Sequence, residues 1–372
     1  MSRLKFLFIE PFFGGSHRSF AEGLVAHSRH SFDLVTLPAR FWKWRLRGAA
    51  LHFFKKIKNI AHYDGIITSD MMSLSDFKAL TGPVCPPVLV YFHENQLTYP
   101  LAPGESRDFQ YGFTDLTTAL AADRILFNSH THHDAFFTHL PKFIKMMPEY
   151  RPNWAVAEIK AKSGVLYPGC SFEKENDPSG KIDLQDKTGA APLIIWNHRW
   201  EFDKKPDDFF AAIDSLVSRK IDFRLALLGE NFQVVPKAFI AARKRLGARI
   251  VCYGYEESHA RYIDWLKQGA VVVSTAIQEN FGIAAVEAMR YGCVPLLPQR
   301  LAYPEVLPRQ FHAHSLYSDQ ADLEQKLGRL IKNYPQSAAP YHKLPEAMKV
   351  FAWEEMISHY DDELANLVEP EG

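Results

Sequence analysis

The segment from Val271 to Ala288 constrains the fold of this chain more than any other. It begins with three valines, which are typical of a central strand in a parallel sheet because such a strand is buried on both faces. Gly282 then permits close approach to the backbone where a helix is expected to start, and amide groups at a helix start bind anions. Two carboxylates lie nearby, Glu279 in the turn and Glu287 within the helix. A carboxylate repels phosphate, so Glu279 is expected to accept hydrogen bonds from hydroxyl groups, and the segment predicts a nucleotide-sugar site.

Strand-length apolar runs alternate with amphipathic segments through both halves of the chain. Strands are expected at residues 4–9, 65–68, 88–92, 124–127, 193–196, 224–228, 249–253, 271–273 and 293–297. Alternation of this kind predicts two doubly wound α/β domains, and 372 residues exceed what one ordinary core holds. The predicted domains are residues 1–171 and 192–350, with a polar linker at 172–191 and an amphipathic C-terminal segment at 351–372 that returns to the first domain.

The composition excludes several classes of protein. Lys+Arg and Asp+Glu both number 43, so the chain as a whole has no net charge that attracts nucleic acid, and a hydrophobic content of 47% indicates a packed globular enzyme. The four cysteines are far apart in the sequence, which indicates a reducing compartment and argues against zinc. The first apolar run is too short for a signal peptide or a membrane span, so we expect a cytoplasmic protein.

Polar residues follow several of the expected strands, at the edge where open parallel sheets bind ligands. Arg199 follows the strand at 193–196 and Lys204 precedes a helix opened by Pro206, so these two cations are expected to neutralise a diphosphate without a metal ion. His93 follows the strand at 88–92 and is a candidate hydrogen-bonding partner for a substrate hydroxyl group.

Gly14 and Gly15 follow the first strand, where they either let a phosphate approach the backbone or form a plain tight turn. His132 and His133 are adjacent and would point apart on a helix, so a solvated helix face is expected there and not a metal site.

Residues 40–58 contain no acidic residue and interleave cations with aromatic rings. The cations are Arg40, Lys43, Arg45, Arg47, Lys55, Lys56 and Lys58, and the rings are Phe41, Trp42, Trp44, Phe53 and Phe54. Basic charge attracts phosphates and aromatic faces stack on bases, which favours a polyanion contact. The alternative is an amphipathic helix with a solvated basic face and its tryptophans in the core.

Taken in order, these features resemble retaining GT-B glycosyltransferases, whose motif of two glutamates separated by seven residues matches Glu279 and Glu287. A narrower resemblance, to the tRNA-queuosine mannosyltransferase family, covers nearly the whole chain. It rests on Phe13-Gly14-Gly15-Ser16-His17, Tyr91-Phe92-His93-Glu94-Asn95-Gln96-Leu97, Arg107-Asp108-Phe109-Gln110-Tyr111-Gly112, Asn197-His198-Arg199-Trp200-Glu201 and Tyr303-Pro304-Glu305.

The resemblance implies two Rossmann-like domains that face a central cleft, GDP-mannose as the donor, queuosine in a tRNA anticodon as the acceptor, and no metal ion or other cofactor. His93, Glu279, Arg199 and Lys204 would then be catalytic, with Glu279 on the donor sugar and Glu287 on the ribose. Further donor contacts are expected at Gly14, Gly15, Gly254, Tyr255, Asn280, Phe281, Gly282 and Ile283. Acceptor contacts are expected at Lys43, Arg45, Arg47, Lys55, Lys56, Asn95 and Arg107.

Two other functions fit the same residues. One is an enzyme of this fold that uses a lipid or glycan acceptor, in which case residues 40–58 would face a membrane surface. The other is a non-catalytic RNA-binding module that retains a vestigial donor site.

Overall fold

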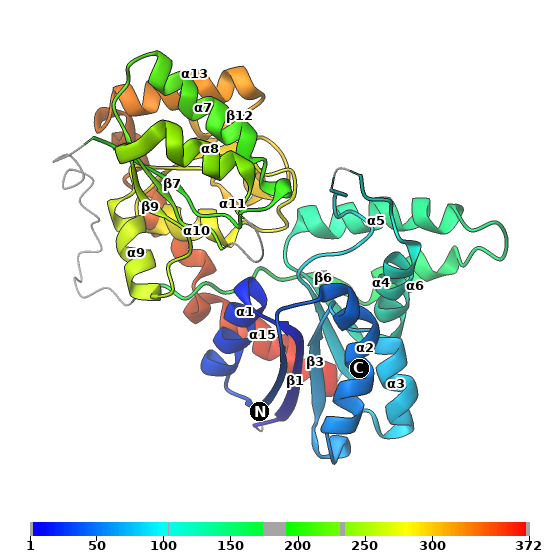
Figure 1. Ribbon diagram of the computed structural model, residues 1–372. Helices are drawn as coiled ribbons and strands as arrows, with labels where there is room; N and C mark the ends of the chain where they lie inside the picture. Colours follow the sequence, from blue (N-terminus) through cyan, green and yellow to red (C-terminus); the bar gives the residue numbers. More distant parts are fainter. Residues whose placement is uncertain (1–2, 103, 174–190, 231–234, 370–372) are drawn as a thin grey trace. The chain divides into compact units, whose positions relative to one another are not determined.

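The computed structural model describes residues 3–102, 104–173, 191–230 and 235–369, which form two compact units. Unit 1 comprises residues 1–171 and 351–372, and unit 2 comprises residues 172–350 (Figure 1). In each unit the described residues build a six-stranded parallel sheet with helices packed against it. The predicted fold of two doubly wound α/β domains is therefore confirmed. The predicted linker at 172–191 lies almost entirely outside the described residues.

Unit 1 has the strand order β2-β1-β3-β4-β5-β6. Its strands are β1 (Lys5–Phe13), β2 (Ser31–Pro38), β3 (Gly65–Ser69), β4 (Val88–Phe92), β5 (Arg124–Phe127) and β6 (Ser163–Val165). Its helices are α1 (Gly15–His27), α2 (Trp42–Lys56), α3 (Leu74–Thr81), α4 (Phe109–Ala121), α5 (His130–Lys145), α6 (Trp154–Ala161) and α15 (Trp353–Val368).

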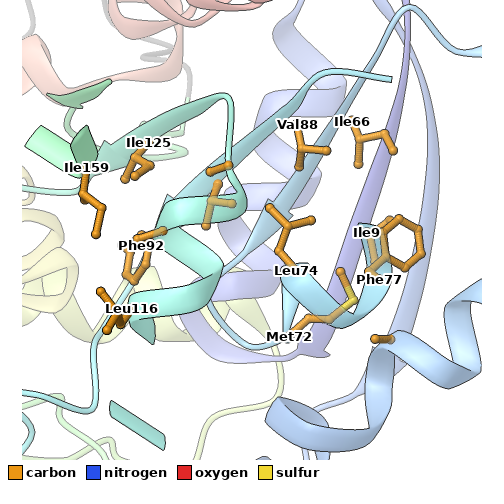
Figure 2. Close-up of a cluster of buried hydrophobic side chains, with 14 of the residues drawn as sticks. Ile9, Ile66, Met72, Leu74, Phe77, Val88, Phe92, Leu116, Ile125 and Ile159 are labelled. Carbon is orange, nitrogen blue, oxygen red and sulfur yellow. The ribbon is translucent and has the colours of Figure 1, made fainter. Parts of the chain in front are cut away.

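Alternating side chains of the unit 1 strands supply two separate cores. Leu7 and Ile9 of β1 face a core completed by helices α2 to α6, part of which Figure 2 shows. Phe6 and Phe8 point to the opposite face, where α1 and α15 cover the sheet. Because successive side chains of a strand point to opposite faces, an uninterrupted apolar run is what a strand covered on both sides requires.

Helix α15 brings the end of the chain back to unit 1. Its first residue, Trp353, is completely buried beside Phe20 of α1, and the backbone nitrogen of Trp353 donates to the carbonyl of Cys170. A Cβ atom at Gly23 or at Gly169 would overlap the Trp353 indole, so both glycines leave the space that this ring fills.

Unit 2 has the strand order β12-β11-β10-β7-β8-β9. Its strands are β7 (Leu193–Trp196), β8 (Arg224–Leu227), β9 (Ile250–Tyr253), β10 (Val271–Val273), β11 (Val294–Pro298) and β12 (Leu316–Tyr317). Its helices include α7 (Pro206–Ser218), α8 (Lys237–Leu246), α9 (His259–Gln268), α10 (Ile283–Arg290), α11 (Tyr303–Val306), α12 (His312–Ser315), α13 (Gln320–Lys332) and α14 (Leu344–Ala347).

The differences from the sequence prediction fall mainly at the sheet edges. The strands that were not predicted, β2, β6 and β12, are all edge strands. Residues of β2 and β6 are mostly half-buried and β12 has two residues, so none of them carries a long apolar run. The first strand continues through Pro11 to Phe13, beyond its predicted end at residue 9, and the motif Tyr303-Pro304-Glu305 opens the short helix α11. Among the described residues, no helix is long and apolar enough to cross a membrane.

The packing around Trp353 leads to a stability prediction. Gly23→Ala places a methyl group against the immobile indole, so we expect a loss of about 1–3 kcal/mol of stability through overpacking. The matched control is Gly48→Ala in α2, where no atom lies within 4 Å of the added Cβ and the higher helix propensity of alanine favours folding. Thermal unfolding of both variants checks the prediction, and an equal Tm for the two would contradict it.

Candidate functional site

The strand order of unit 2 fixes where a ligand binds. The first strand of this unit, β7, lies between β8 and β10. The strands β8 and β9 continue the sheet on one side of β7, and β10, β11 and β12 continue it on the other. In open parallel sheets, ligands bind beyond the carboxyl ends of the strands at such a switch point. The segments that follow β7 and β10 contain Arg199 and Glu279, respectively, and the chain therefore brings together two predicted site segments that are distant in sequence.

Lys204 is the most heavily bonded group of this site. Its Nζ donates to the carbonyl oxygen of Gln278 (2.6 Å) and to Oε2 of Glu279 (3.3 Å), and it lies 3.3 Å from Oδ2 of Asp203. Its side chain is buried, which by itself lowers the pKa of the ammonium group, but the charges of Glu279 and Asp203 outweigh this effect and raise the pKa. Lys204 therefore stays protonated at neutral pH and fixes the Glu279 carboxylate.

The loop between β10 and α10 is held from several sides. The Thr275 hydroxyl donates to the carbonyl oxygens of Lys204 (2.8 Å) and Lys205 (2.9 Å), and the Tyr317 hydroxyl donates to the carbonyl of Ser274 (2.9 Å). Arg300 donates to the carbonyl of Ala276 (3.2 Å). These bonds satisfy buried backbone groups and leave the loop with one well-defined conformation.

Arg199 differs from Lys204 in its exposure. Its side chain is 39% exposed and pairs with Glu201 at 3.3 Å, whereas the Lys204 side chain is 8% exposed. An exposed guanidinium can bind a diphosphate in bidentate fashion, while Lys204 already has two carboxylate partners. The two predicted cations therefore occupy different environments.

Gly282 precedes α10 with a φ of +98°, a conformation that glycine adopts at little cost. A Cβ at this position would lie 3.3 Å from the Tyr303 ring. Phe281 is buried, and Asn280 accepts a hydrogen bond from Gln278 (3.1 Å). The first amides of a helix have no carbonyl partner within it, so the start of α10 at Ile283 supplies anion-binding groups.

Glu287 lies on α10 in a buried polar network. Its Oε2 accepts a hydrogen bond from the Tyr262 hydroxyl (2.8 Å), which in turn accepts one from Asn197 (3.0 Å). Burial raises the pKa of Glu287 to about 7. The carboxyl group is therefore poised between its two protonation states near neutral pH, and additional hydrogen-bond donors would favour the charged form.

Two predicted donor residues lie further along the sheet. Gly254 and Tyr255 follow β9, the edge strand that β8 separates from β7. Gly254 has a φ of +119°, and the Tyr255 side chain is exposed. The geometry of unit 2 thus brings Lys204 and Glu279 into contact, but it leaves Gly254 and Tyr255 two strands away from β7.

A second polar cluster occupies the carboxyl ends of β1, β3 and β4 in unit 1. The Glu10 carboxylate is fully buried, its Oε1 accepts from Ser69 (2.9 Å), and its Oε2 lies 3.3 Å from Nδ1 of His17. The His17 ring packs on the His93 ring with 4.0 Å between centroids. The backbone nitrogen of His93 donates to Asp70 (2.8 Å), so the predicted residue His93 is placed by neighbours that the sequence analysis did not single out.

The two imidazoles of this cluster are perturbed in opposite directions. Burial lowers the pKa of His17, but the adjacent Glu10 carboxylate outweighs it and the pKa of His17 is raised. Burial, together with the charge on His17, holds the pKa of His93 well below its usual value. The cluster therefore favours the charged form of His17 and the neutral form of His93, and a neutral imidazole has one ring nitrogen that accepts a hydrogen bond.

The same cluster is chemically suited to a cation. One ligand atom from each of Glu10, His17 and His93 lies within 4.8 Å of the others, and a set of two imidazoles and one carboxylate suits zinc or a related metal. The grouping was not predicted, because Glu10 and His17 are distant in sequence from His93. The expected independence from metal ions remains a prediction.

The glycine pair has a structural explanation of its own. A Cβ at Gly14 would overlap the Cβ of Ala39, so close packing of β1 against the end of β2 requires glycine there. Gly15, the first residue of α1, has a φ of +50°. These facts support the tight-turn interpretation, and the predicted donor contact stays a prediction.

Asn95 and His132 are buried and Arg107 is half-buried, where a more exposed role was expected for all three. Asn95 is fully buried and its Oδ1 accepts two hydrogen bonds from Thr98, so it stabilises the loop after β4, and its acceptor contact stays a prediction. Arg107 donates to the carbonyl oxygens of Gln96 (2.6 Å), Leu97 (3.2 Å) and Tyr99 (3.2 Å), which makes it a clamp on the same loop. His132 is buried beside Asn128, and burial lowers its pKa to about 3, so the predicted solvated face is wrong for this residue.

Helix α2 carries the predicted acceptor cations on its outer side. Lys43, Arg47, Lys55 and Lys56 are exposed, and Arg45 is half-buried because it donates to the Pro38 carbonyl (3.3 Å). Phe41 is 67% exposed and Trp44 is 76% exposed, so the alternative that places the tryptophans in the core is wrong for Trp44, whereas Trp42 is half-buried. Exposed rings beside cations are the combination that binds nucleic acid.

Sequence reasoning missed several residues of the two clusters, namely Glu10, His17, Asp70, Asp203 and Tyr262. A usable signal exists for two of them. Glu10 is a lone carboxylate within an apolar strand, and Asp203 directly precedes Lys204. For the others, the partners are brought together only by the parallel sheet.

Two doubly wound domains of this kind have the architecture of the GT-B fold. The chain folds like sucrose-phosphate synthase from Thermosynechococcus elongatus (TM-score 0.74, 15% identity, 99% of this chain and 100% of that one). It also folds like the catalytic domain of starch synthase IV from Arabidopsis thaliana (TM-score 0.67, 12% identity, 99% and 100% covered).

The sequence comparisons identify the family. Residues 5–170 match the family model for the N-terminal part of tRNA-queuosine alpha-mannosyltransferase, and residues 183–347 match glycosyl transferases group 1. The chain is 36% identical over 329 residues to the tRNA-queuosine alpha-mannosyltransferase of Drosophila melanogaster, which covers 86% of this chain and 85% of the relative. The protein therefore belongs to the tRNA-queuosine alpha-mannosyltransferase family.

The raised pKa of Glu287 gives a pH-dependent stability prediction. The folded protein binds this proton more tightly than the unfolded chain does, so the contribution of Glu287 to stability is full below the ordinary glutamate pKa and is lost as the pH rises towards 7. Glu287→Gln keeps an acceptor for Tyr262 but cannot ionise. We expect the Tm of the wild type, relative to this variant, to fall between pH 5 and pH 8. A constant difference across this range would contradict the assignment.

Proposed function

We propose that this protein transfers mannose from GDP-mannose to queuosine in the anticodon of a tRNA, with retention of configuration and without a metal ion. The observation that carries the proposal is the similarity to a tRNA-queuosine alpha-mannosyltransferase over 86% of the chain. The charged cluster at the switch point of unit 2 supports a nucleotide-sugar donor. Because tRNA and nucleotide sugars are both substrates, the cytoplasm is the compartment we expect.

In this proposal Arg199 and Lys204 have different roles in binding the donor. The half-exposed Arg199 and the first amides of α10 bind the diphosphate. The buried Lys204 aims Glu279 at hydroxyl groups of the sugar, because it holds both the Glu279 carboxylate and the neighbouring Gln278 carbonyl. Glu287 accepts hydrogen bonds from the ribose, which stabilise its charged form.

The same groups explain transfer without a metal ion. As the glycosidic bond to the diphosphate breaks, negative charge builds up on the leaving oxygen, and a preorganised cation and amides stabilise that charge more in the transition state than in the ground state. The attacking hydroxyl of queuosine approaches the same face of the sugar, and its proton passes to the departing phosphate. His93 of unit 1, which is buried and has a lowered pKa, is the candidate hydrogen-bonding partner of a substrate hydroxyl group in this proposal.

Helix α2 is the proposed acceptor surface. The exposed ammonium groups of Lys43, Lys55 and Lys56 contact tRNA phosphates, and the exposed Trp44 ring supplies a stacking face. The binding energy is therefore electrostatic in large part and falls as the salt concentration rises.

Mass spectrometry of tRNA nucleosides tests the function. Incubation with GDP-mannose is expected to add one hexose to queuosine, with no product from tRNA that lacks queuosine and none with UDP-glucose.

Activity should persist in EDTA. Loss of activity in EDTA with recovery on adding zinc would overturn metal independence and direct attention to Glu10, His17 and His93. Binding of tRNA with no transfer from any donor would favour a non-catalytic module, and transfer only to a lipid or glycan would reassign the acceptor.

Replacement of Arg199 tests the donor site. Arg199→Ala removes a charge from the leaving group, so we expect kcat to fall by about 10²–10³ at saturating tRNA with an unchanged Tm. Arg245→Ala is the matched control, because Arg245 is also a partly exposed cation of unit 2 paired with a carboxylate, Asp214. Full activity of Arg199→Ala would rule out this role.

A further inference from the structure

The turn between α5 and α6 presents aromatic rings to solvent. Tyr150 is 89% exposed, Trp154 is 58% exposed and Met146 is 56% exposed. The turn forms the outer end of a helical hairpin that projects from unit 1 (Figure 1). Exposed large apolar side chains that are grouped within a short segment are typical of an interaction surface.

The turn holds these rings in a fixed arrangement. The backbone nitrogens of Met146 and Met147 donate to the carbonyls of Phe143 and Ile144, and Arg151 donates through Nε to the carbonyl of Met147 (2.7 Å). Phe143 anchors the hairpin against Phe113 of α4, with 4.8 Å between ring centroids. The exposed rings therefore extend from a hydrogen-bonded turn with a buried base.

Tyr150 adopts a costly backbone conformation. Its φ is +49°, which is unfavourable for a bulky residue, and it lies between Pro148 and Pro152. Phe41, before α2, shows the same combination of a positive φ (+55°) and an exposed ring. In both places the chain accepts a strained conformation at an exposed aromatic residue.

The charge around the turn is predominantly positive. Residues 141–154 contain Lys142, Lys145 and Arg151 against a single acid, Glu149, and all four side chains are exposed. Cations that alternate with aromatic rings match a polyanion with unpaired bases, since phosphates attract the cations and base faces stack on the rings.

Aromatic contacts connect this turn to the α2 surface within unit 1. The Trp42 ring of α2 lies 5.1 Å from the Tyr111 ring of α4, and Phe109 at the start of α4 lies 6.4 Å from Phe143 of α5. Helices α2, α4, α5 and α6 belong to one layer, because they all pack into the same core. The two basic, aromatic segments are therefore parts of one helical layer.

We propose that the α5–α6 turn, residues 142–154, is a second tRNA-binding surface, on which Tyr150 and Trp154 stack on unpaired bases while Lys142 and Lys145 contact phosphates. This inference rests on the proposed tRNA acceptor and extends it, because α2 alone supplied the acceptor contacts above. The surface contributes to affinity for tRNA and leaves the donor site unchanged.

Binding of queuosine-containing tRNA by full-length variants tests the proposal. Tyr150→Ala/Trp154→Ala is expected to weaken tRNA binding about 5–100-fold, and Tyr150→Phe/Trp154→Phe, which keeps the rings, to bind like the wild type. Lys142→Ala/Lys145→Ala should weaken binding and reduce its salt dependence. Matched controls on α8 are Lys237→Ala/Lys244→Ala for charge and Ile240→Ala for an exposed apolar side chain.

Further measurements separate this surface from folding and from the proposed function. Every variant should keep the wild-type Tm, kcat and affinity for GDP-mannose, and only Tyr150→Ala/Trp154→Ala and Lys142→Ala/Lys145→Ala should have a higher KM for tRNA. Ultraviolet cross-linking should join tRNA to the peptide that contains Tyr150. Wild-type tRNA affinity in both Tyr150→Ala/Trp154→Ala and Lys142→Ala/Lys145→Ala would overturn the second tRNA-binding surface. This holds even if these variants fail to bind a protein partner. In that case, weaker tRNA binding by the α2 variant Lys43→Ala/Lys55→Ala/Lys56→Ala would still support the proposed function. A wild-type protein that neither binds nor modifies tRNA would overturn both.

Discussion

A buried ammonium group must have anionic or carbonyl partners, and the partners of Lys204 determine the geometry of unit 2. Its Nζ joins the segment after β7 to the loop after β10 through Gln278, Glu279 and Asp203. A charge in this environment is stable only while these partners stay in place, so the loop and the cation fix each other. The orientation of Glu279 and the position of Gly282 before α10 both follow from this arrangement.

The parallel sheets explain why both units have a polar cluster at the same end of their strands. In each sheet the first strand lies between strands that are reached in opposite directions, and the carboxyl ends are where loops diverge. At the carboxyl end of its sheet, unit 2 has a cation held by carboxylates and the start of a helix. At the same position, unit 1 has a buried carboxylate and two stacked imidazoles. The same topology therefore supports two kinds of chemistry through different side chains.

The helical layer of unit 1 serves a different purpose from the strand ends. One side of α2 and of the α5–α6 hairpin supplies the core, and the other carries exposed rings and cations. A polyanion such as tRNA needs an extended basic surface, and a layer of packed helices offers one without disturbing the sheet. In the proposed function, recognition of a large acceptor is thereby separated from the proposed bond-forming groups.

The sequence by itself determined the doubly wound fold, the bounds of central strands such as β4, β5 and β7, and the motif that contains Glu279 and Glu287. These features depend on local burial, which an apolar run records directly. The tertiary structure alone decided the edge strands β2, β6 and β12, because these strands lack a long apolar run. It also decided that Asn95 and Arg107 serve their own loop, that Lys204 is neutralised by Asp203 and Glu279, and that Glu10, His17 and His93 lie together. The Lys204–Glu279 pair and the approach of His93 to Glu10 and His17 join residues far apart in the chain, and they exist only once the parallel strands are in register.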